Sequence, residues 1–235
     1  MPILNSIAQS DKAHTDTLIL APTRELAQQI DQMAEGLAYF TGISSVAVFG
    51  GGDGIVYEQQ RTAIKNNVNV IIATPGRLIA HITSGLLKMD KLKHLVLDEA
   101  DRMLDMGFQD DIMRIIRHLP THRQTLLFSA TMPPRIRTLA NSILKYPEHI
   151  NIAISQPAEG INQQIYRVFD HQKTALIRML LKDGQYASTL IFASTKEKVK
   201  QLYKELKSAH INVNAFHSDF KQSEREQILL DFKNK

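Results

Sequence analysis

Three carboxylates follow a short apolar run near the middle of the chain. The run His94–Leu97 leads directly into Asp98, Glu99, Ala100 and Asp101. A rigidly placed aspartate can hold the water shell of a Mg²⁺ ion bound to a nucleotide, and the next carboxylate can polarise an attacking water. Acidic residues also favour the first turn of an ordinary helix, where they interact with its dipole. The tetrad therefore indicates a magnesium–nucleotide site, with an acidic helix start as the alternative.

Small and cationic residues follow three other predicted strands. These clusters are Pro22–Ala27, Gly50–Gly52 and Thr74–Arg77. Free N–H groups at a helix start, together with an arginine, can bind a backbone phosphate. Thr and Pro also suit the N-cap and first position of any helix, and glycines also form tight turns. Each cluster is thus compatible with phosphate binding or with ordinary helix and turn chemistry.

Ser129 and Thr131 follow a further predicted strand. No histidine that could act as a base stands near them in the sequence, so we interpret them as hydrogen-bonding residues rather than nucleophiles. The nine histidines show no spacing typical of zinc ligands, and the absence of cysteine excludes disulfides and thiolate metal sites.

These motifs, in this order, resemble the DEAD-box family of ATP-dependent RNA helicases in its bacterial form. Pro22–Ala27 resembles motif Ia, Gly51-Gly52 the GG motif and Thr74–Arg77 motif Ib. Asp98–Asp101 matches motif II, and Ser129–Thr131 matches motif III. Several short motifs in a fixed order are much more specific than any one of them.

The resemblance continues in the last third of the chain. Leu190–Thr195 resembles motif IV, and His217–Asp219 with Gln222 and Arg225 resembles the block after it. The segment after Asp101, which runs to Phe108, is also typical of bacterial members. The likeness therefore extends over nearly the whole chain.

The resemblance implies a role for each carboxylate of the tetrad. ATP and Mg²⁺ would be the cofactors, with Asp98 holding the metal through water and Glu99 activating the attacking water. Asp101, Ser129 and Thr131 would link the ATP-bound state to closure of two domains.

The resemblance also implies that the partner is RNA rather than a membrane. The contacts would go to the sugar-phosphate backbone of one strand, which makes binding independent of base sequence. The residues implied are Pro22, Thr23, Arg24, Gly51, Gly52, Thr74, Pro75, Gly76, Arg77, Thr195, Gln222 and Arg225.

Short apolar runs alternate with helical patterns, which predicts an α/β fold with a parallel sheet. Ligands of such sheets lie beyond the carboxyl ends of the strands, so the clusters above should share one rim. The predicted strands of the first segment are Thr17–Ala21, Ser45–Phe49, Val70–Ala73, His94–Leu97, Thr125–Phe128 and His149–Ile152. Its predicted helices include Arg24–Tyr39, Val56–Asn66, Asp110–His118 and Pro134–Leu144.

A linker-like stretch, Ser155–Gly160, interrupts the alternation. We therefore predict a RecA-like domain over residues 1–154, a linker over 155–162 and the start of a second RecA-like domain over 163–235. The predicted strands of the second segment are Ile165–Phe169, Thr189–Ala193 and Val213–Phe216. Its predicted helices are Lys173–Lys182, Lys196–Ala209 and Gln222–Lys233.

Composition and charge agree with a globular protein that binds an anionic partner. The 235 residues are 43% hydrophobic and 22% charged, and they contain neither a membrane-length apolar run nor a signal-peptide pattern at the start. Residues 163–235 hold 13 Lys and Arg against 8 Asp and Glu, whereas residues 1–162 hold 15 against 16. The surplus suits a nucleic acid or forms a solvated helix face. The lack of cysteine fits a reducing cytosol, so we expect a cytoplasmic protein.

Two parts of an ATP-hydrolysing site, the phosphate-binding loop and the arginine finger, are not found in the chain. The phosphate-binding loop has the form Gly-x-x-x-x-Gly-Lys-Ser/Thr, and no glycine here is followed by lysine. The resemblance places this loop and the family's first strand upstream, and the arginine finger downstream. We therefore expect a chain truncated at both ends, with two inner strand edges of its first sheet unpaired and little or no ATP hydrolysis of its own.

Three alternatives stay open at this point. The chain could be a non-catalytic RNA-binding or interaction fragment of such a helicase. It could also lack a stable fold, or derive from a DNA-directed relative in the wider helicase superfamily.

Overall fold

The computed structural model describes residues 1–235 except 11–12, 52–53, 153–159, 185 and 235. The chain divides into two compact units, Met1–Ile150 and Asn151–Lys235. The predicted linker, residues 155–162, lies mostly outside the described residues, so the predicted domain limits stay a prediction. None of the helices in the described ranges combines the length and the apolarity needed to cross a bilayer.

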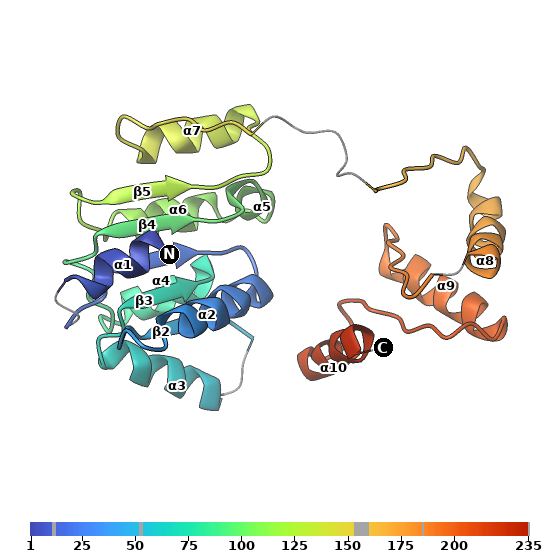
Figure 1. Ribbon diagram of the computed structural model, residues 1–235, viewed down its shortest axis with the longest axis horizontal. Coiled ribbons are helices and arrows are strands. Elements are labelled where there is room, and N and C mark those ends of the chain that lie inside the picture. Colours follow the sequence, from blue (N-terminus) through green and yellow to red (C-terminus); the bar gives the residue numbers. More distant parts are fainter. Residues whose placement is uncertain (11–12, 52–53, 153–159, 185, 235) are drawn as a thin grey trace. The chain divides into compact units, whose positions relative to one another are not determined.

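The first unit is built on a parallel sheet with the strand order β2-β3-β1-β4-β5 (Figure 1). This arrangement confirms the predicted α/β class, and five predicted strands are found with ends that differ by at most one residue. The strands are β1 (Thr17–Leu20), β2 (Ser45–Val48), β3 (Val70–Ala73), β4 (His94–Leu97) and β5 (Gln124–Leu127).

Helices cover both faces of this sheet, which explains why its central strands are mostly apolar and buried. Side chains of a strand point alternately to opposite faces, so Leu18 and Ile71 join the larger core cluster while Ile72 joins the smaller one. The larger cluster includes residues of α3 to α7, and the smaller one residues of α1 and α2. The helices are α1 (Pro2–Ala8), α2 (Arg24–Ala38), α3 (Gly54–Lys65), α4 (Pro75–Thr83), α5 (Ala100–Asp105), α6 (Gln109–Ile116) and α7 (Pro134–Ile143).

The expected pair of unpaired inner strand edges is not present, so that prediction is wrong. β1 lies in the middle of the sheet, and its residues pair with β3 on one side and β4 on the other. β3 and β4 are themselves paired on both sides, which leaves β2 and β5 as the edges of a continuous sheet. The five strands therefore form a rigid platform without a gap.

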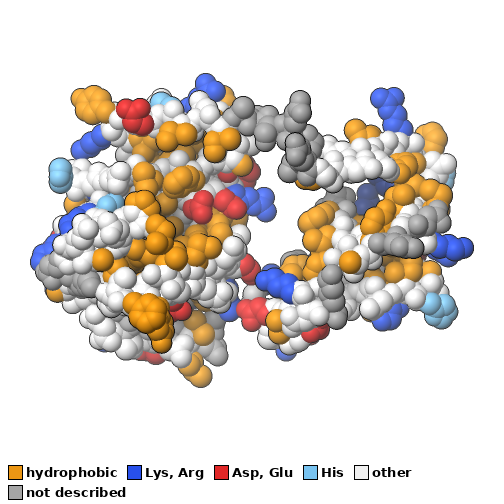
Figure 2. All heavy atoms as spheres, viewed as in Figure 1, with side chains coloured by type: hydrophobic (Ala, Val, Ile, Leu, Met, Phe, Trp, Pro, Cys, Tyr) orange, Lys and Arg blue, Asp and Glu red, His pale blue; other side chains and the backbone are white. Residues whose placement is uncertain are grey.

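The second unit contains the three helices that the sequence predicts. They are α8 (Lys173–Asp183), α9 (Lys196–Ser208) and α10 (Gln222–Asn234), with a 3₁₀ turn, η1 (Asp170–Gln172), before α8. Among the described residues of this unit, only the hydrophobic side chains of Leu206 and Ala215 are buried. Figure 2 shows hydrophobic side chains of this unit at its surface.

Four predicted strands are wrong: His149–Ile152, Ile165–Phe169, Thr189–Ala193 and Val213–Phe216 are not strands in the structure. A strand has no internal hydrogen bonds and exists only when a neighbour pairs with it. Among the described residues, none of the four segments pairs with a neighbour, and side chains such as Ile150 and Phe192 are 87% and 92% exposed, although Ala215 is buried. Their β-forming composition alone was not sufficient, because the neighbouring strand decides whether such a segment is ordered.

Candidate functional site

The carboxyl edge of the first sheet brings together the polar clusters predicted from the sequence. Main-chain hydrogen bonds continue the pairing past the ends of the strands and hold the following residues in place. The N–H groups of Asp98, Thr74 and Phe128 donate to the carbonyls of Leu20 (3.0 Å), Val48 (2.9 Å) and Leu97 (2.8 Å). The residues after β1, β3, β4 and β5 therefore start from one rigid rim.

Glu99 has an unusual backbone conformation at this rim. Its φ and ψ angles are 50° and 51°, in the left-handed region. Residues other than glycine, asparagine and aspartate rarely adopt this region. Glu99 occupies the N-cap position of α5, but its side chain makes no capping hydrogen bond. The N–H of Glu99 donates to Oδ1 of Asp98 at 3.0 Å. Capping therefore does not explain this acidic residue, and strained residues of this kind cluster at functional sites.

Asp98 and Glu99 fit the chemistry of a magnesium ion. Mg²⁺ prefers carboxylate oxygens, keeps several of its waters and needs only one or two protein carboxylates when a nucleotide supplies the rest. Asp98 is partly exposed and Glu99 is exposed, so both carboxylates are accessible to a hydrated ion. In the described residues, no group of three or more His, Cys, Asp or Glu forms a closed metal cage. An ion here would be held through water by one or two side chains.

Asp101, Ser129 and Thr131 form one hydrogen-bonded network. Oδ2 of Asp101 accepts the N–H of Thr131 at 2.9 Å and its hydroxyl at 2.7 Å. The Ser129 hydroxyl accepts the Asp101 N–H at 3.3 Å and donates to the Thr131 carbonyl at 2.7 Å. The network joins the first turn of α5 to the segment after β5, so a shift of one would be transmitted to the other.

This network should stabilise the protein in a pH-dependent way. Burial raises the pKa of Asp101, but the hydrogen bonds from Thr131 and from the Arg102 N–H outweigh it and lower the pKa below the usual 3.8. A carboxyl with a lowered pKa stabilises the fold above its unfolded pKa, and this contribution is lost as the pH falls through the folded pKa. We expect Asp101→Asn to lower the free energy of unfolding by about 1 kcal/mol at neutral pH, a small value because the network is partly exposed.

Urea unfolding at several pH values checks this expectation. The difference between wild type and Asp101→Asn should be constant near neutral pH and should vanish well below pH 3.8. Asp90→Asn, at an exposed position, is the control and should show no such trend. A difference that grows as the pH falls would contradict the assignment.

Thr23 and Arg24 start α2 at the same rim. The Thr23 hydroxyl accepts the Leu26 N–H at 3.2 Å, so Thr23 caps the helix, which is one of the two roles that the sequence left open. The guanidinium of Arg24 lies 4.6 Å from the centroid of the Phe49 ring, a cation–π distance. Pro22 is buried directly before them. The arginine is thus held beside the end of β2.

Arg77 lies at the same end of β2. Its guanidinium is 5.3 Å from the centroid of the Tyr57 ring, and a Cβ atom placed on Gly50 would lie 3.9 Å from it. Thr74 is the N-cap of α4 without a capping hydrogen bond from its side chain, and Pro75 takes the first position. Capping therefore does not account for the Thr74 hydroxyl.

The glycines near β2 differ in what the structure shows of them. Gly51 has a φ of 83°, which a residue with a side chain would adopt only with strain. Gly76, within the first turn of α4, is exposed and has open space around its Cα. Gly52 lies outside the described residues, so its predicted role stays untested.

The predicted site residues of the second unit lie on two helix starts. Thr195 caps α9, where its hydroxyl accepts the Lys198 N–H at 3.2 Å. Gln222 and Arg225 are hydrogen-bonded to each other within α10. Two lysines of α9, Lys196 and Lys200, form ion pairs with Asp219, at 2.9 and 2.6 Å.

These ion pairs bear on the basic surplus of the second unit. Hydrogen bonds from Lys200 and Lys196 lower the pKa of Asp219 to about 2. The two lysines are therefore partly neutralised within the fold. This favours the solvated-helix interpretation for part of the surplus, and leaves the other lysines of α9 for an anionic partner.

Phe49, Tyr57 and His81 were not predicted as site residues, yet they surround the two arginines. His81 is fully buried, and its ring stacks on Tyr57 with centroids 5.2 Å apart and planes at 12°. The available signal was weak: Arg77 and His81 are one helical turn apart, and Phe49 ends a predicted strand. The contact across α3 and α4 is not visible in the sequence.

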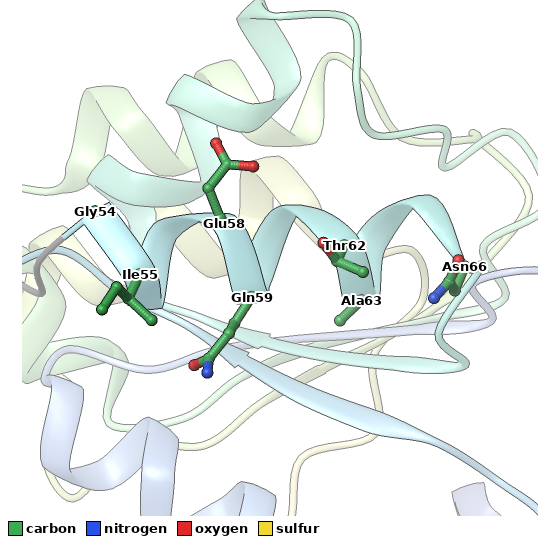
Figure 3. A pocket seen from close by; sticks show the side chains of 7 residues that line it. All are labelled: Gly54, Ile55, Glu58, Gln59, Thr62, Ala63 and Asn66. Carbon is green, nitrogen blue, oxygen red and sulfur yellow. The ribbon is translucent and has the colours of Figure 1, made fainter.

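A shallow hollow of about 750 Å³ runs along α3 (Figure 3). Ile55 and Gln59 point to one side of the helix in this view, and Glu58 points to the other. Its lining contains none of the predicted site residues. The hollow is therefore separate from the candidate site at the rim.

Two family models match the chain. The DEAD/DEAH box helicase model covers residues 1–139, and the helicase conserved C-terminal domain model covers residues 171–235. The first match includes the Asp98–Asp101 tetrad and the rim, and the second includes α9 and α10.

Individual relatives and solved structures agree with these models. The chain is 36% identical to the ATP-dependent RNA helicase DbpA of Bacillus subtilis over 231 residues, which are 98% of this chain and 48% of that protein. It is 38% identical to the DEAD-box ATP-dependent RNA helicase RhpA of Helicobacter pylori over 235 residues, 99% of this chain and 46% of that protein. The chain thus spans about half the length of the relatives it matches.

A solved structure of a Saccharomyces cerevisiae Dbp5 variant bound to RNA and ADP BeF3 matches with a TM-score of 0.78. The identity is 29%, over 98% of this chain and 58% of that one. Another structure of this Dbp5 variant, bound to Gle1 and IP6, matches with a TM-score of 0.73 and 30% identity over 95% of this chain and 55% of that one. With its motif order, its parallel sheet and these matches, the chain belongs to the DEAD/DEAH box helicase family, in the DEAD-box branch of ATP-dependent RNA helicases.

Proposed function

We propose that the chain is part of an ATP-dependent RNA helicase that separates short RNA duplexes or remodels RNA–protein complexes. This part binds RNA and activates the water that attacks ATP. One observation carries the proposal. Arg24 follows β1, which pairs directly with β4, the strand that leads into Asp98 and Glu99. Residues suited to RNA phosphates and residues suited to a magnesium–nucleotide thus start from neighbouring strands of one rigid sheet.

In this proposal each part of the tetrad has a separate task. When bound, Mg²⁺–ATP would supply the phosphoanhydride bond, and Asp98 would hold the metal through water. Glu99 would accept the proton of the attacking water; its carboxylate is exposed and follows the end of β4, which supports this role. Asp101 connects the tetrad to Ser129 and Thr131, which makes the segment after β5 responsive to the state of the site.

RNA binding in this proposal depends on the backbone and not on the bases. Arginine guanidinium groups and the free N–H groups at the starts of α2 and α4 are donors for phosphate oxygens. Thr195, Gln222 and Arg225 add contacts from the second unit. The relatives named above are RNA helicases, and one similar structure contains RNA and a nucleotide with BeF3, which supports the same ligands here. We place this activity in the cytoplasm, because the chain has no cysteine.

A second candidate is an RNA-binding part that does not itself hydrolyse ATP. It is favoured by the absence of any Gly-Lys pair in these 235 residues, since the lysine of a phosphate-binding loop contributes strongly to ATP chemistry. We expect the 235 residues alone to release phosphate slowly. Both candidates require the same RNA-binding rim.

Titration of the chain with labelled oligouridine and oligoadenosine tests the RNA proposal. We expect the two dissociation constants to agree within about threefold, because backbone contacts carry no base information. The logarithm of affinity should fall linearly with the logarithm of salt, with a slope of about 0.7 per neutralised phosphate. A tenfold preference for one base, or affinity that is independent of salt, would contradict the proposal.

A further inference from the structure

Arg77 is held by an aromatic ring rather than by an acid. Its guanidinium lies 5.3 Å from the Tyr57 ring centroid, and among the described residues no carboxylate forms an ion pair or hydrogen bond with it. A ring holds a guanidinium through its π face and leaves the N–H donors unused. As far as the described residues show, the donors of Arg77 stay available for an anion.

Tyr57 contacts two residues of α4 at once. Arg77 and His81 are one turn apart and lie on one side of the helix, and the Tyr57 ring of α3 contacts both. Tyr57 is half-buried: its ring contacts α4, and part of its side chain is exposed to solvent. The three side chains form a row from the buried His81 to the partly exposed Arg77.

His81 is an unusual residue for a plain core position. It is fully buried, and neither ring nitrogen has a hydrogen-bond partner among the described residues. Burial and then the charges of Arg77 and Arg61 lower the pKa of His81, so its ring is neutral at physiological pH. A buried polar group without a partner is costly, and a hydrophobic residue would fill the space at lower cost. The flat imidazole fits a role in stacking on Tyr57.

We propose that Tyr57 and His81 are positioning residues that hold the Arg77 guanidinium beside Gly50 for contact with an RNA phosphate. This inference rests on the RNA-binding function proposed above. A long arginine side chain loses rotamer freedom when it binds, and an arginine that is already held loses less. Tyr57 and His81 therefore strengthen RNA binding without contacting RNA themselves.

Anisotropy titration of the full chain with labelled oligouridine tests this role. We expect Tyr57→Leu to weaken binding about fivefold, the value of an exposed cation–π contact, and Tyr57→Phe to stay within about twofold of wild type. In an Arg77→Ala background, Tyr57→Leu should add no further loss, because its effect acts through Arg77. His81→Ala should resemble Tyr57→Leu, and His81→Phe, which keeps a flat ring, should resemble wild type.

One further readout and one control variant keep the outcomes apart. The Nε–Hε NMR signal of Arg77 should carry a ring-current shift that Tyr57→Leu removes and Tyr57→Phe keeps, whether or not RNA is present. Tyr39→Leu is the control for loss of a tyrosine, since Tyr39 is 78% exposed and follows the far end of α2. Its affinity should equal that of wild type.

Three results would overturn the inference. They are an Arg77 signal without the ring-current shift, equal affinity of Tyr57→Leu and wild type, and equal losses from Tyr57→Leu with and without Arg77. If Arg77→Ala weakens binding while Tyr57→Leu does not, the inference fails and the proposed function stands. If the wild-type chain does not bind oligouridine, both fail.

Discussion

The double variant Arg24→Ala/Arg77→Ala is expected to bind RNA about 10²-fold more weakly than wild type. Both guanidinium groups lie at the carboxyl end of β2, where Phe49 and Tyr57 hold them. Loss of one hydrogen-bonded contact to a charged group costs about 1.5 kcal/mol, or roughly tenfold in affinity. The losses of binding free energy from the two substitutions should be nearly additive, because the two arginines contact different aromatic rings.

Filter binding at several salt concentrations measures this effect. The double variant should also lose about 1.4 from the salt slope, since each single-strand phosphate contact contributes about 0.7. Arg114→Ala/Arg117→Ala is the matched control, because it removes the same charge from exposed positions at α6, away from the rim. Equal losses in the two double variants would show that net charge, and not the rim, governs binding.

The amino-acid sequence is sufficient to locate the strands that carry the site. Val70–Ala73 and His94–Leu97 are short apolar runs bounded by polar or turn-forming residues, and both are strands with the predicted ends. Since parallel strands end at the same edge, the polar residues after each run are predictable as neighbours on one rim. The helices of both units are predictable for a different reason. The hydrogen bonds of a helix join residues that are close in the sequence, so the local pattern is enough to indicate it.

The order of the strands is not predictable in this way. β1 could be expected anywhere in the sheet from its own residues, and only its pairing with β3 and β4 shows that it is central. The same dependence on neighbours explains the wrong prediction of strands at His149–Ile152 and in the second unit, where side chains such as Phe192 are exposed.

The side-chain contacts of the site are also not predictable from the sequence. Tyr57 and Arg77 are far apart along the chain and belong to different helices, so nothing local links them. The left-handed backbone at Glu99 is a further example, because glutamate rarely adopts this conformation and the motif alone does not show it.

Glu99→Gln is expected to slow RNA-stimulated ATP hydrolysis by about 10²-fold or more. The substitution keeps the size of the side chain but removes the base, and general-base catalysis contributes about 10²- to 10⁴-fold. The experiment uses a chimera in which residues 1–235 replace the matching segment of the ATP-dependent RNA helicase DbpA of Bacillus subtilis, to which the chain is 36% identical. Glu148→Gln, at an exposed position after α7, is the control and should leave the rate unchanged.

We propose that the Asp98–Asp101 tetrad and the two arginines of the rim, Arg24 and Arg77, act together in ATP-dependent RNA remodelling. Phosphate release from this chimera, measured with and without RNA, tests it most directly. We predict release that RNA stimulates and that both Glu99→Gln and the Arg24→Ala/Arg77→Ala pair suppress. A folded chimera whose release does not respond to RNA, or whose rate is the same after Glu99→Gln, would contradict the account.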